Sequence, residues 1–146
     1  MAGFGFGAAA YAKVDMDTAI LAASPHKLIS MLFDGALQAL NEGMGAMENK
    51  DIPAKGRALT KAIRILDEGL KSALNDKAGG ELSAHLRDLY DYMVMRLLQA
   101  NLQNDVKKIR EVIQLLGQIR EAWVAIDEYG QVQAMQNEGL EAVAKV

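Results

Sequence analysis

The segment Leu89–Leu98 reads LYDYMVMRLL, and only Asp91 and Arg96 interrupt its apolar side chains. At about 100° per residue, these side chains cover nearly the whole circumference of a helix. One stripe consists of Leu82, Leu86, Leu89, Met93, Leu97 and Ala100, and a second of Tyr90, Val94 and Leu98, with Tyr92 and Met95 behind them. A helix that is apolar on every side needs burial, but a chain of 146 residues is too short to enclose one of its own helices. We therefore predict that a partner, or a second copy of the chain, covers the surplus apolar surface.

Four amphipathic segments with short polar breaks make up most of the chain. Ser24-Pro25 is a helix start, because Ser caps the first turn and Pro suits its first position. Pro53 follows a polar break and begins the second segment, and the glycines of Asn75–Gly80 separate the second from the third. Asn104 caps the fourth segment. The expected helices cover residues 25–47, 53–74, 81–103 and 105–127.

Connections this short make successive helices antiparallel neighbours. The sequence therefore predicts an all-α fold, an antiparallel up-down-up-down four-helix bundle. We expect a flexible N-terminal arm at residues 1–23, the bundle at 24–128, and a flexible or weakly helical tail at 129–146.

Composition excludes several classes of function. The net charge of −3 argues against nucleic-acid binding, which needs clustered Lys and Arg. The absence of cysteine rules out disulfides and thiolate metal sites and fits a reducing cytoplasm. No apolar run approaches the roughly 18 residues of a membrane span, and the start lacks the basic and long apolar regions of a signal peptide. We expect a cytoplasmic protein that does not insert into membranes.

Residues suited to catalysis are scarce. His26 and His85 lie near the starts of alternate helices, so the two could be neighbours, but the Glu-x-x-His spacing of di-metal bundles is missing. Glu81 precedes His85 by four positions, and His26 has no such partner. No phosphate-binding loop and no nucleophile beside a base appears. We predict solvated histidines, no metal, no cofactor and no enzymatic activity.

Three further features allow two interpretations each. Leu28, Gly35 and Ala39 form a strip of mostly small side chains beside the buried face of the first helix, which indicates either close helix packing or a contact with a partner. Ile65 lies off the buried face of its helix, where it is either a lone exposed residue or the floor of a shallow groove. Asn101 either makes a helix-end hydrogen bond or binds the backbone of a peptide.

Three blocks of the sequence resemble a known family. The first runs from Ser24-Pro25-His26 through Asp34-Gly35-Ala36, preceded by Thr18; the second is Leu89–Met93 with Leu97–Asn101 and Asn104-Asp105; the third is Arg120-Glu121-Ala122-Trp123. Together they closely resemble the flagellin-export chaperones of the FliS family, collinearly over about residues 11–127. One departure is Phe33, where the family often has Tyr.

The resemblance implies a cytoplasmic chaperone of type III secretion that binds the disordered C-terminal segment of flagellin and prevents its premature polymerisation. It also implies delivery to the cytoplasmic domain of the export gate, and contacts with other flagellar regulators. In the family an N-terminal arm can cover the client surface, which corresponds here to Tyr11 and Val14. From their positions on the helices, we expect client contacts at Leu28, Gly35, Ala39, Ile65, Tyr90, Val94, Leu98 and Asn101. The alternative is a homo-oligomeric structural bundle.

Overall fold

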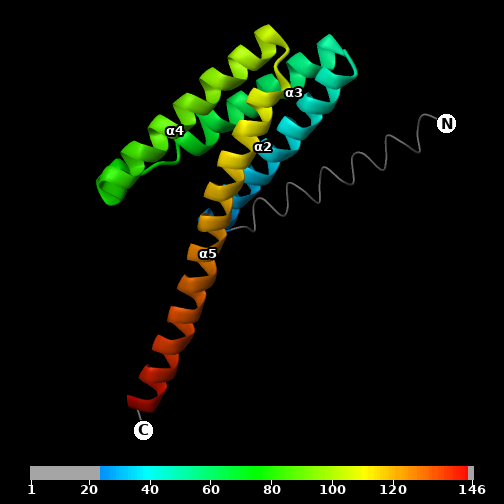
Figure 1. Ribbon diagram of the computed structural model, residues 1–146. Helices are drawn as coiled ribbons and strands as arrows, with labels where there is room; N and C mark the ends of the chain where they lie inside the picture. Colours follow the sequence, from blue (N-terminus) through cyan, green and yellow to red (C-terminus); the bar gives the residue numbers. More distant parts are fainter. Residues whose placement is uncertain (1–23, 145–146) are drawn as a thin grey trace, which may run out of the picture.

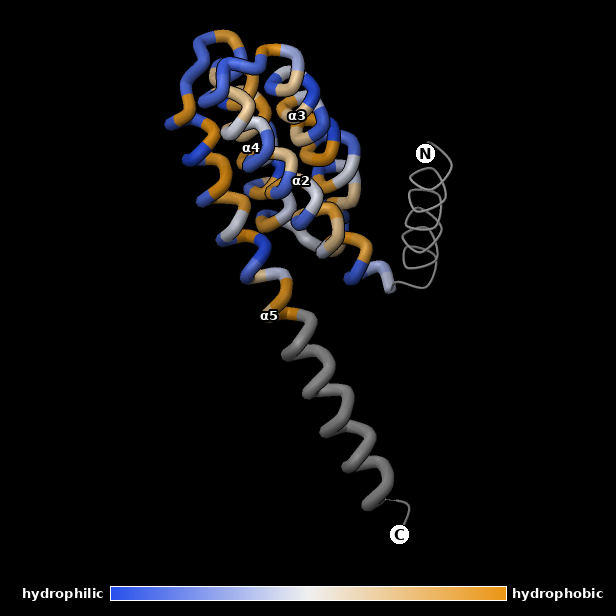
Figure 2. Tube along the Cα trace, turned by 90° about the vertical axis from the view of Figure 1, so that its right-hand side faces the viewer, coloured by the Kyte–Doolittle hydropathy of each residue, from blue (hydrophilic) through white to orange (hydrophobic). Residues whose placement is uncertain are grey.

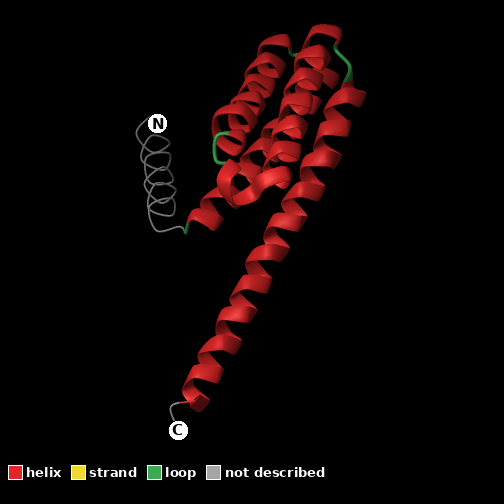
Figure 3. Cartoon of the chain, turned by 90° about the vertical axis from the view of Figure 1, so that its left-hand side faces the viewer, coloured by secondary structure: helices red, strands yellow, loops and turns green. Residues whose placement is uncertain are grey.

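A computed structural model describes residues 24–144 of the chain, and the side chains of residues 24–126. The elements are α2 (Pro25–Glu48), α3 (Ile52–Arg64), the π-helix η1 (Ile65–Lys71), α4 (Asp76–Gln103) and α5 (Val106–Ala144). α3 passes directly into η1, so that the two form one helical rod of the bundle (Figure 1). The described residues contain no strand, and the predicted all-α four-helix bundle is confirmed (Figure 3).

The helices pack as a ring of neighbours. α2 packs against α3, η1 and α5, while α4 packs against α5, η1 and α3. Hydrophobic and hydrophilic residues recur in turn along the coloured part of each helix (Figure 2), as expected for amphipathic helices around a shared core. The largest fully buried side chains are Phe33, Leu40, Leu59, Leu66, Met93, Leu97, Ile109, Val112 and Leu116. The core therefore takes side chains from all four rods.

The helix starts follow the local signals in the sequence. Ser24 is the N-cap of α2, and its Oγ accepts a hydrogen bond from Lys27 N at 3.1 Å. Asp51 caps α3 by accepting from Ala54 N at 3.2 Å. Asn75 caps α4 in the same way, with its Oδ1 accepting from two backbone N–H groups. Each cap satisfies donors that the first turn of a helix leaves unpaired.

The π-helix η1 departs from the helix that the sequence predicts. We predicted one α-helix over residues 53–74, but residues 65–71 adopt the wider π geometry. Leu66 and Leu70 are both buried, so a spacing of four apolar residues fits either geometry. Gly69 lies within η1, where an added Cβ would come 3.3 Å from the side chain of Leu32 on α2. The close approach of α2 thus coincides with the wider turn.

Two helix boundaries also differ from expectation. The expected start near Glu81 corresponds to a kink at Gly80 (φ 53°, ψ −126°), and a first helical turn precedes it from Asp76. This backbone conformation is essentially restricted to glycine. α5 does not end near Asp127 but continues to Ala144, and its C-terminal part projects beyond the bundle (Figures 1 and 3). No Pro interrupts this segment, and isolated glycines cost only about 1 kcal/mol each.

A buried lysine fastens one end of the bundle. Lys55 on α3 is almost fully buried, and its Nζ donates to the Asn101 carbonyl at 2.9 Å and to Asn104 Oδ1 at 2.6 Å. Asn104 has a left-handed backbone (φ 52°) and ends α4. The expected cap of the fourth helix by Asn104 is therefore wrong, and Asp105 Oδ1 instead accepts from Lys107 N at 3.0 Å before α5. Lys55 therefore ties α3 to the turn between α4 and α5. Within the described residues, none of the helices is both long and apolar enough to cross a membrane.

Candidate functional site

One flank of α4 carries apolar side chains that the bundle does not cover. Leu97 is fully buried, whereas its neighbour Leu98 is 56% exposed. Leu102, one turn further on, is 86% exposed, and Met95 is 48% exposed. Met95, Leu98 and Leu102 follow each other at helical spacing and form a continuous exposed strip, which we call the α4 strip. The surplus predicted from the sequence is therefore present on α4.

Ion pairs and hydrogen bonds on either side define where the α4 strip faces. Asp91 lies seven residues before Leu98, on the same side of the helix, and its carboxylate pairs with Lys71 Nζ of η1 at 2.7 Å. The opposite side of α4 carries Arg96, which pairs with Glu111 of α5 at 3.1 Å. The α4 strip therefore lies between these two sets of contacts, on the solvent side of α4.

A second apolar feature is a groove of about 350 Å³ between α2, η1, α4 and α5. None of its lining residues is charged, and they include Phe33, Leu70, Leu82, Leu86, Tyr90, Trp123 and Ile126. Leu82 and Ile126 are more than half exposed at its rim, while Tyr90 is only 3% exposed within it. We call this feature the Trp123 groove. It offers an opening for apolar side chains of a partner.

Trp123 is held in place by the start of α2. The His26 ring stacks on the Trp123 ring with centroids 4.3 Å apart and planes 3° from parallel. Trp123 Nε1 donates to the His26 carbonyl at 3.2 Å, and His26 Nε2 lies 2.9 Å from the Trp123 carbonyl. The prediction of solvated histidines is thus wrong for His26, which is half-buried, and confirmed for the exposed His85. Sequence spacing does not reveal this contact because 97 residues separate the two rings.

A third feature is an open groove of about 820 Å³ along the outer side of α3 and η1. Ile65 and Leu32 contribute to its apolar lining, and Gly56 and Gly69 leave room beside them. An added Cβ on Gly35 would contact Ile65 Cδ1 at 3.5 Å, so Gly35 lies beneath this isoleucine. We call this feature the α3 groove. The interpretation of Ile65 as part of a groove framed by small residues agrees with this arrangement.

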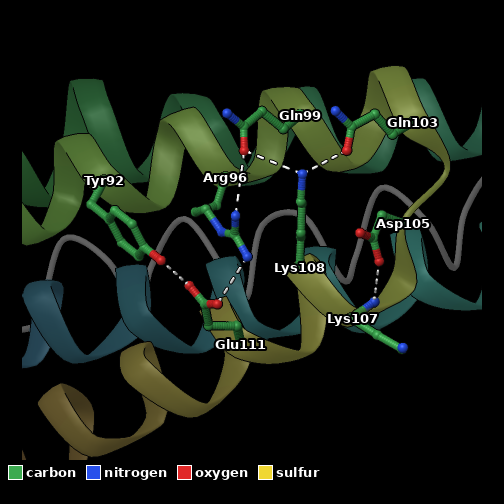
Figure 4. A network of polar contacts seen from close by, with 8 residues as sticks. All are labelled: Tyr92, Arg96, Gln99, Gln103, Asp105, Lys107, Lys108 and Glu111. Carbon is green, nitrogen blue, oxygen red and sulfur yellow. Dashed lines mark hydrogen bonds and ion pairs between the residues drawn. The ribbon is translucent and has the colours of Figure 1, made fainter.

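Polar side chains join α4 to α5 (Figure 4). The Tyr92 hydroxyl donates to one oxygen of Glu111, and Arg96 Nη2 donates to the other at 3.1 Å. Lys108 of α5 reaches back to Gln99 at 3.3 Å and to Gln103 at 2.6 Å. These contacts hold α4 in the orientation that presents the α4 strip.

The Glu111 network is expected to stabilise the fold at neutral pH but not in acid. The hydrogen bond from Tyr92, and then Arg96, lower the pKa of Glu111 below its ordinary value, against the opposing effect of burial. Because the folded-state pKa is the lower one, this contribution is present above the unfolded-state pKa and is lost as the pH falls through the folded-state pKa. Glu111→Gln should therefore have a lower urea midpoint than the unaltered chain at pH about 7. Below pH about 4 the two midpoints should be equal.

The matched control for this measurement is Glu121→Gln. Glu121 is exposed and makes no ion pair within residues 24–126. Its replacement should leave the urea midpoint unchanged at both pH values. An equal deficit for Glu111→Gln in acid and at neutral pH would contradict the role of the carboxylate charge.

The structure separates the residues that we expected to form one client surface. Leu98 is exposed and Val94 half-buried on α4, whereas Ile65 lines the α3 groove and packs next to Gly35. The expected exposure of Tyr90 is wrong, because its ring is buried in the core and this burial raises its pKa to about 12.

The small residues of α2 serve internal packing in part. Ala39 is buried, which agrees with close helix packing as one of the two interpretations of this strip, while Leu28 is half-buried. Gly43 is also buried, and Leu59 of α3 lies directly against it. Asn101 offers its backbone carbonyl to Lys55, which is a helix-end hydrogen bond, and its side chain is half-buried. Whether these residues contact a client stays a prediction.

Two exposed residues were overlooked in the sequence. Leu102 follows Leu98 by four positions, and this spacing was the signal that could have identified it. Ile52 is 68% exposed and lines the α3 groove. The adjacent Pro53 was interpreted only as a helix start. The arm residues Tyr11 and Val14 lie outside the described residues, and their docking stays a prediction.

Comparison with known proteins decides the family. The family model described as "Flagellar protein FliS" matches residues 7–129. This chain belongs to the FliS family. The flagellar secretion chaperone FliS of Salmonella typhimurium is 53% identical over 120 residues, which are 82% of this chain and 89% of the relative. The FliS of Escherichia coli is 44% identical over 117 residues, covering 80% and 86%, and that of Bacillus subtilis 40% over 101 residues, covering 69% and 74%.

The FliS match covers all the surfaces described above. It includes the whole length of α2, α3, η1 and α4, and α5 as far as residue 129, and therefore the α4 strip and both grooves. The FliS relatives are named as secretion chaperones, a role without catalysis. This agrees with the prediction that the chain is not an enzyme. The family resemblance seen in the sequence is confirmed.

Proposed function

We propose that this chain binds the disordered C-terminal segment of flagellin in the cytoplasm. It would prevent premature polymerisation of flagellin and assist its delivery to the flagellar type III export apparatus, with the cytoplasmic domain of the export gate as a second partner. The observation that carries the proposal is the apolar surface left open on a chain of this family. The α4 strip exposes Met95, Leu98 and Leu102, and the Trp123 groove is open between the helices.

The energetics of binding a disordered segment require such a surface. A segment that folds on binding loses several kcal/mol in ordering, which extended apolar contact must offset. Burial of apolar surface contributes about 25 cal/mol per Å². Separate apolar sites on different helices allow one extended chain to wrap the bundle and add their contributions. Methionine at position 95 suits an irregular partner because its side chain is flexible and polarisable.

Binding of this kind needs no nucleotide hydrolysis. A chaperone that shields an apolar segment acts by mass action, since it lowers the concentration of free client in proportion to its affinity. Release would follow when the export apparatus offers the segment an alternative partner. The residues for which we propose client contact are therefore binding residues and not catalytic ones.

Calorimetric titration with a peptide from the C-terminal end of the organism's own flagellin tests the proposal. We expect binding with a dissociation constant of about 1 μM or tighter, and a negative heat-capacity change from apolar burial. A peptide of the same composition in scrambled order is the control and should bind far more weakly. Absence of binding at micromolar concentrations would overturn the proposal.

Self-association is the alternative use of the exposed apolar side chains. A homo-oligomeric bundle would bury Leu98 and Leu102 against a second copy. The mass in solution without client discriminates the two: it should stay that of a monomer if the surface is kept for flagellin. A mass that rises with concentration, together with failure to bind the peptide, would favour the structural bundle.

A further inference from the structure

The two grooves differ in charge. The Trp123 groove has no charged residue in its lining, whereas Arg57, Lys61, Arg64 and Glu68 line the α3 groove. Three cations and one carboxylate leave the α3 groove with an excess of positive charge, on a chain whose net charge is −3. Its apolar lining is formed by Leu32, Ile52, Pro53 and Ile65. The α3 groove therefore combines an apolar floor with a cationic edge.

The cations form one row along α3. Arg57, Lys61 and Arg64 are spaced by four and then three residues, which places them on one face of the helix. All three are exposed. Like charges at this spacing destabilise a helix slightly. Cations are favourable near the C-terminal end of a helix because they interact with its macrodipole. This effect does not account for the row of cations, because helical structure continues from α3 into η1 beyond Arg64.

Most of this positive charge is not neutralised within the bundle. Arg64 pairs with Glu68 at 3.5 Å, and both side chains are largely exposed. Arg57 and Lys61 make no ion pair or side-chain hydrogen bond within residues 24–126. Glu42 of α2 lines a small hollow together with both of them, but its carboxylate instead accepts from Gln38 at 3.3 Å. Two cations therefore stand at the edge of an apolar groove without a partner in the described fold.

We propose that the α3 groove receives a part of the client that carries carboxylates beside its apolar side chains. This inference rests on the proposed function and assigns the chemistry of one stretch of the bound segment. Apolar side chains of that stretch lie on Ile65 and Leu32, and its Asp or Glu side chains pair with Arg57 and Lys61. The Trp123 groove, which lacks charge, receives a purely apolar stretch. Charge complementarity of this kind fixes which stretch enters which groove and speeds association.

Salt dependence and charge reversal test the inference on the full chain. Titrations with the C-terminal flagellin peptide are made at about 50 mM and about 500 mM salt, where exposed ion pairs are weakly and strongly screened. The unaltered chain should bind several-fold more weakly at high salt. The variant Arg57→Glu with Lys61→Glu should bind about tenfold more weakly at low salt and lose most of the salt dependence.

The matched control reverses two cations elsewhere. Lys77 and Arg110 are exposed and line neither groove, so Lys77→Glu with Arg110→Glu changes the net charge equally without touching the α3 groove. It should bind like the unaltered chain. A peptide whose Asp and Glu residues are changed to Lys supplies the reciprocal test: it should bind the unaltered chain weakly and the Arg57/Lys61 variant more tightly.

The outcomes separate this inference from the proposed function. If the unaltered chain binds the peptide and the Arg57/Lys61 variant binds equally well with the same salt dependence, the charge assignment of the α3 groove is wrong and the proposed function stands. An equal loss of affinity in the control variant would also contradict it, because net charge would then be the cause. If the unaltered chain does not bind the peptide at all, the proposed function fails and this inference fails with it.

Discussion

Leu97→Ala is expected to lower the free energy of unfolding by about 2–5 kcal/mol, whereas Leu98→Ala should lower it by less than about 0.5 kcal/mol. The two residues are adjacent in sequence and identical in type, but Leu97 is fully buried and Leu98 is 56% exposed. Truncation of Leu97 removes buried methyl groups and leaves a cavity that the surrounding helices fill only in part. Truncation of Leu98 removes groups that already contact water.

For client binding, Leu98→Ala should have the larger effect and Leu97→Ala the smaller one. If Leu98 contacts the flagellin segment, Leu98→Ala should weaken binding of the C-terminal peptide by about tenfold, since the lost burial is worth about 1.4 kcal/mol or more. Leu97→Ala should leave the affinity within about twofold at temperatures where it remains folded, because the side chain does not reach the surface.

Urea unfolding followed by far-ultraviolet circular dichroism, and calorimetric titration, measure the two quantities on the same samples. Equal losses of stability in the two variants would contradict the packing of α4. Unchanged affinity in Leu98→Ala would remove the α4 strip from the proposed client surface.

Gly43→Leu is expected to destabilise the bundle by about 3 kcal/mol or more, because overpacking a tight helix contact forces side chains off their rotamers or moves the backbone. A Cβ on Gly43 would already lie 2.9 Å from Leu59 Cδ2. Leu59 is fully buried, and its Cγ and the Cβ of Ala58 would also lie within 3.5 Å of the added atom. The extra atoms of leucine would therefore push α2 away from α3.

Gly45 supplies the matched control on the same helix. An added Cβ there meets nothing within 4 Å, so Gly45→Ala should stabilise the protein by about 1 kcal/mol through helix propensity alone. Thermal or urea unfolding measures the stability of both variants relative to the unaltered chain. Stability of Gly43→Leu equal to that of the unaltered chain would mean that α2 and α3 do not approach as closely as described.

Several features of the fold follow from local sequence signals. In the caps at Ser24, Asp51 and Asn75, the accepting side chain lies within three residues of the donating backbone N–H, so each cap can form from its local segment alone. Short connections fix antiparallel neighbours without further information. The excess of apolar side chains on α4 is likewise visible in the sequence, because it depends only on helical spacing.

The sequence by itself determined an all-α bundle, the starts of its first two helices and the presence of more apolar surface than the chain can bury. Only the tertiary structure decided which of the apolar stripes on α4 is covered: Tyr90 turned inward into the core while Leu98 remained exposed. The tertiary structure also decided the contact between His26 and Trp123 and the placement of the cations at the edge of the α3 groove. Periodicity assigns a side chain to a direction around its own helix, but burial depends on which neighbouring helix lies in that direction.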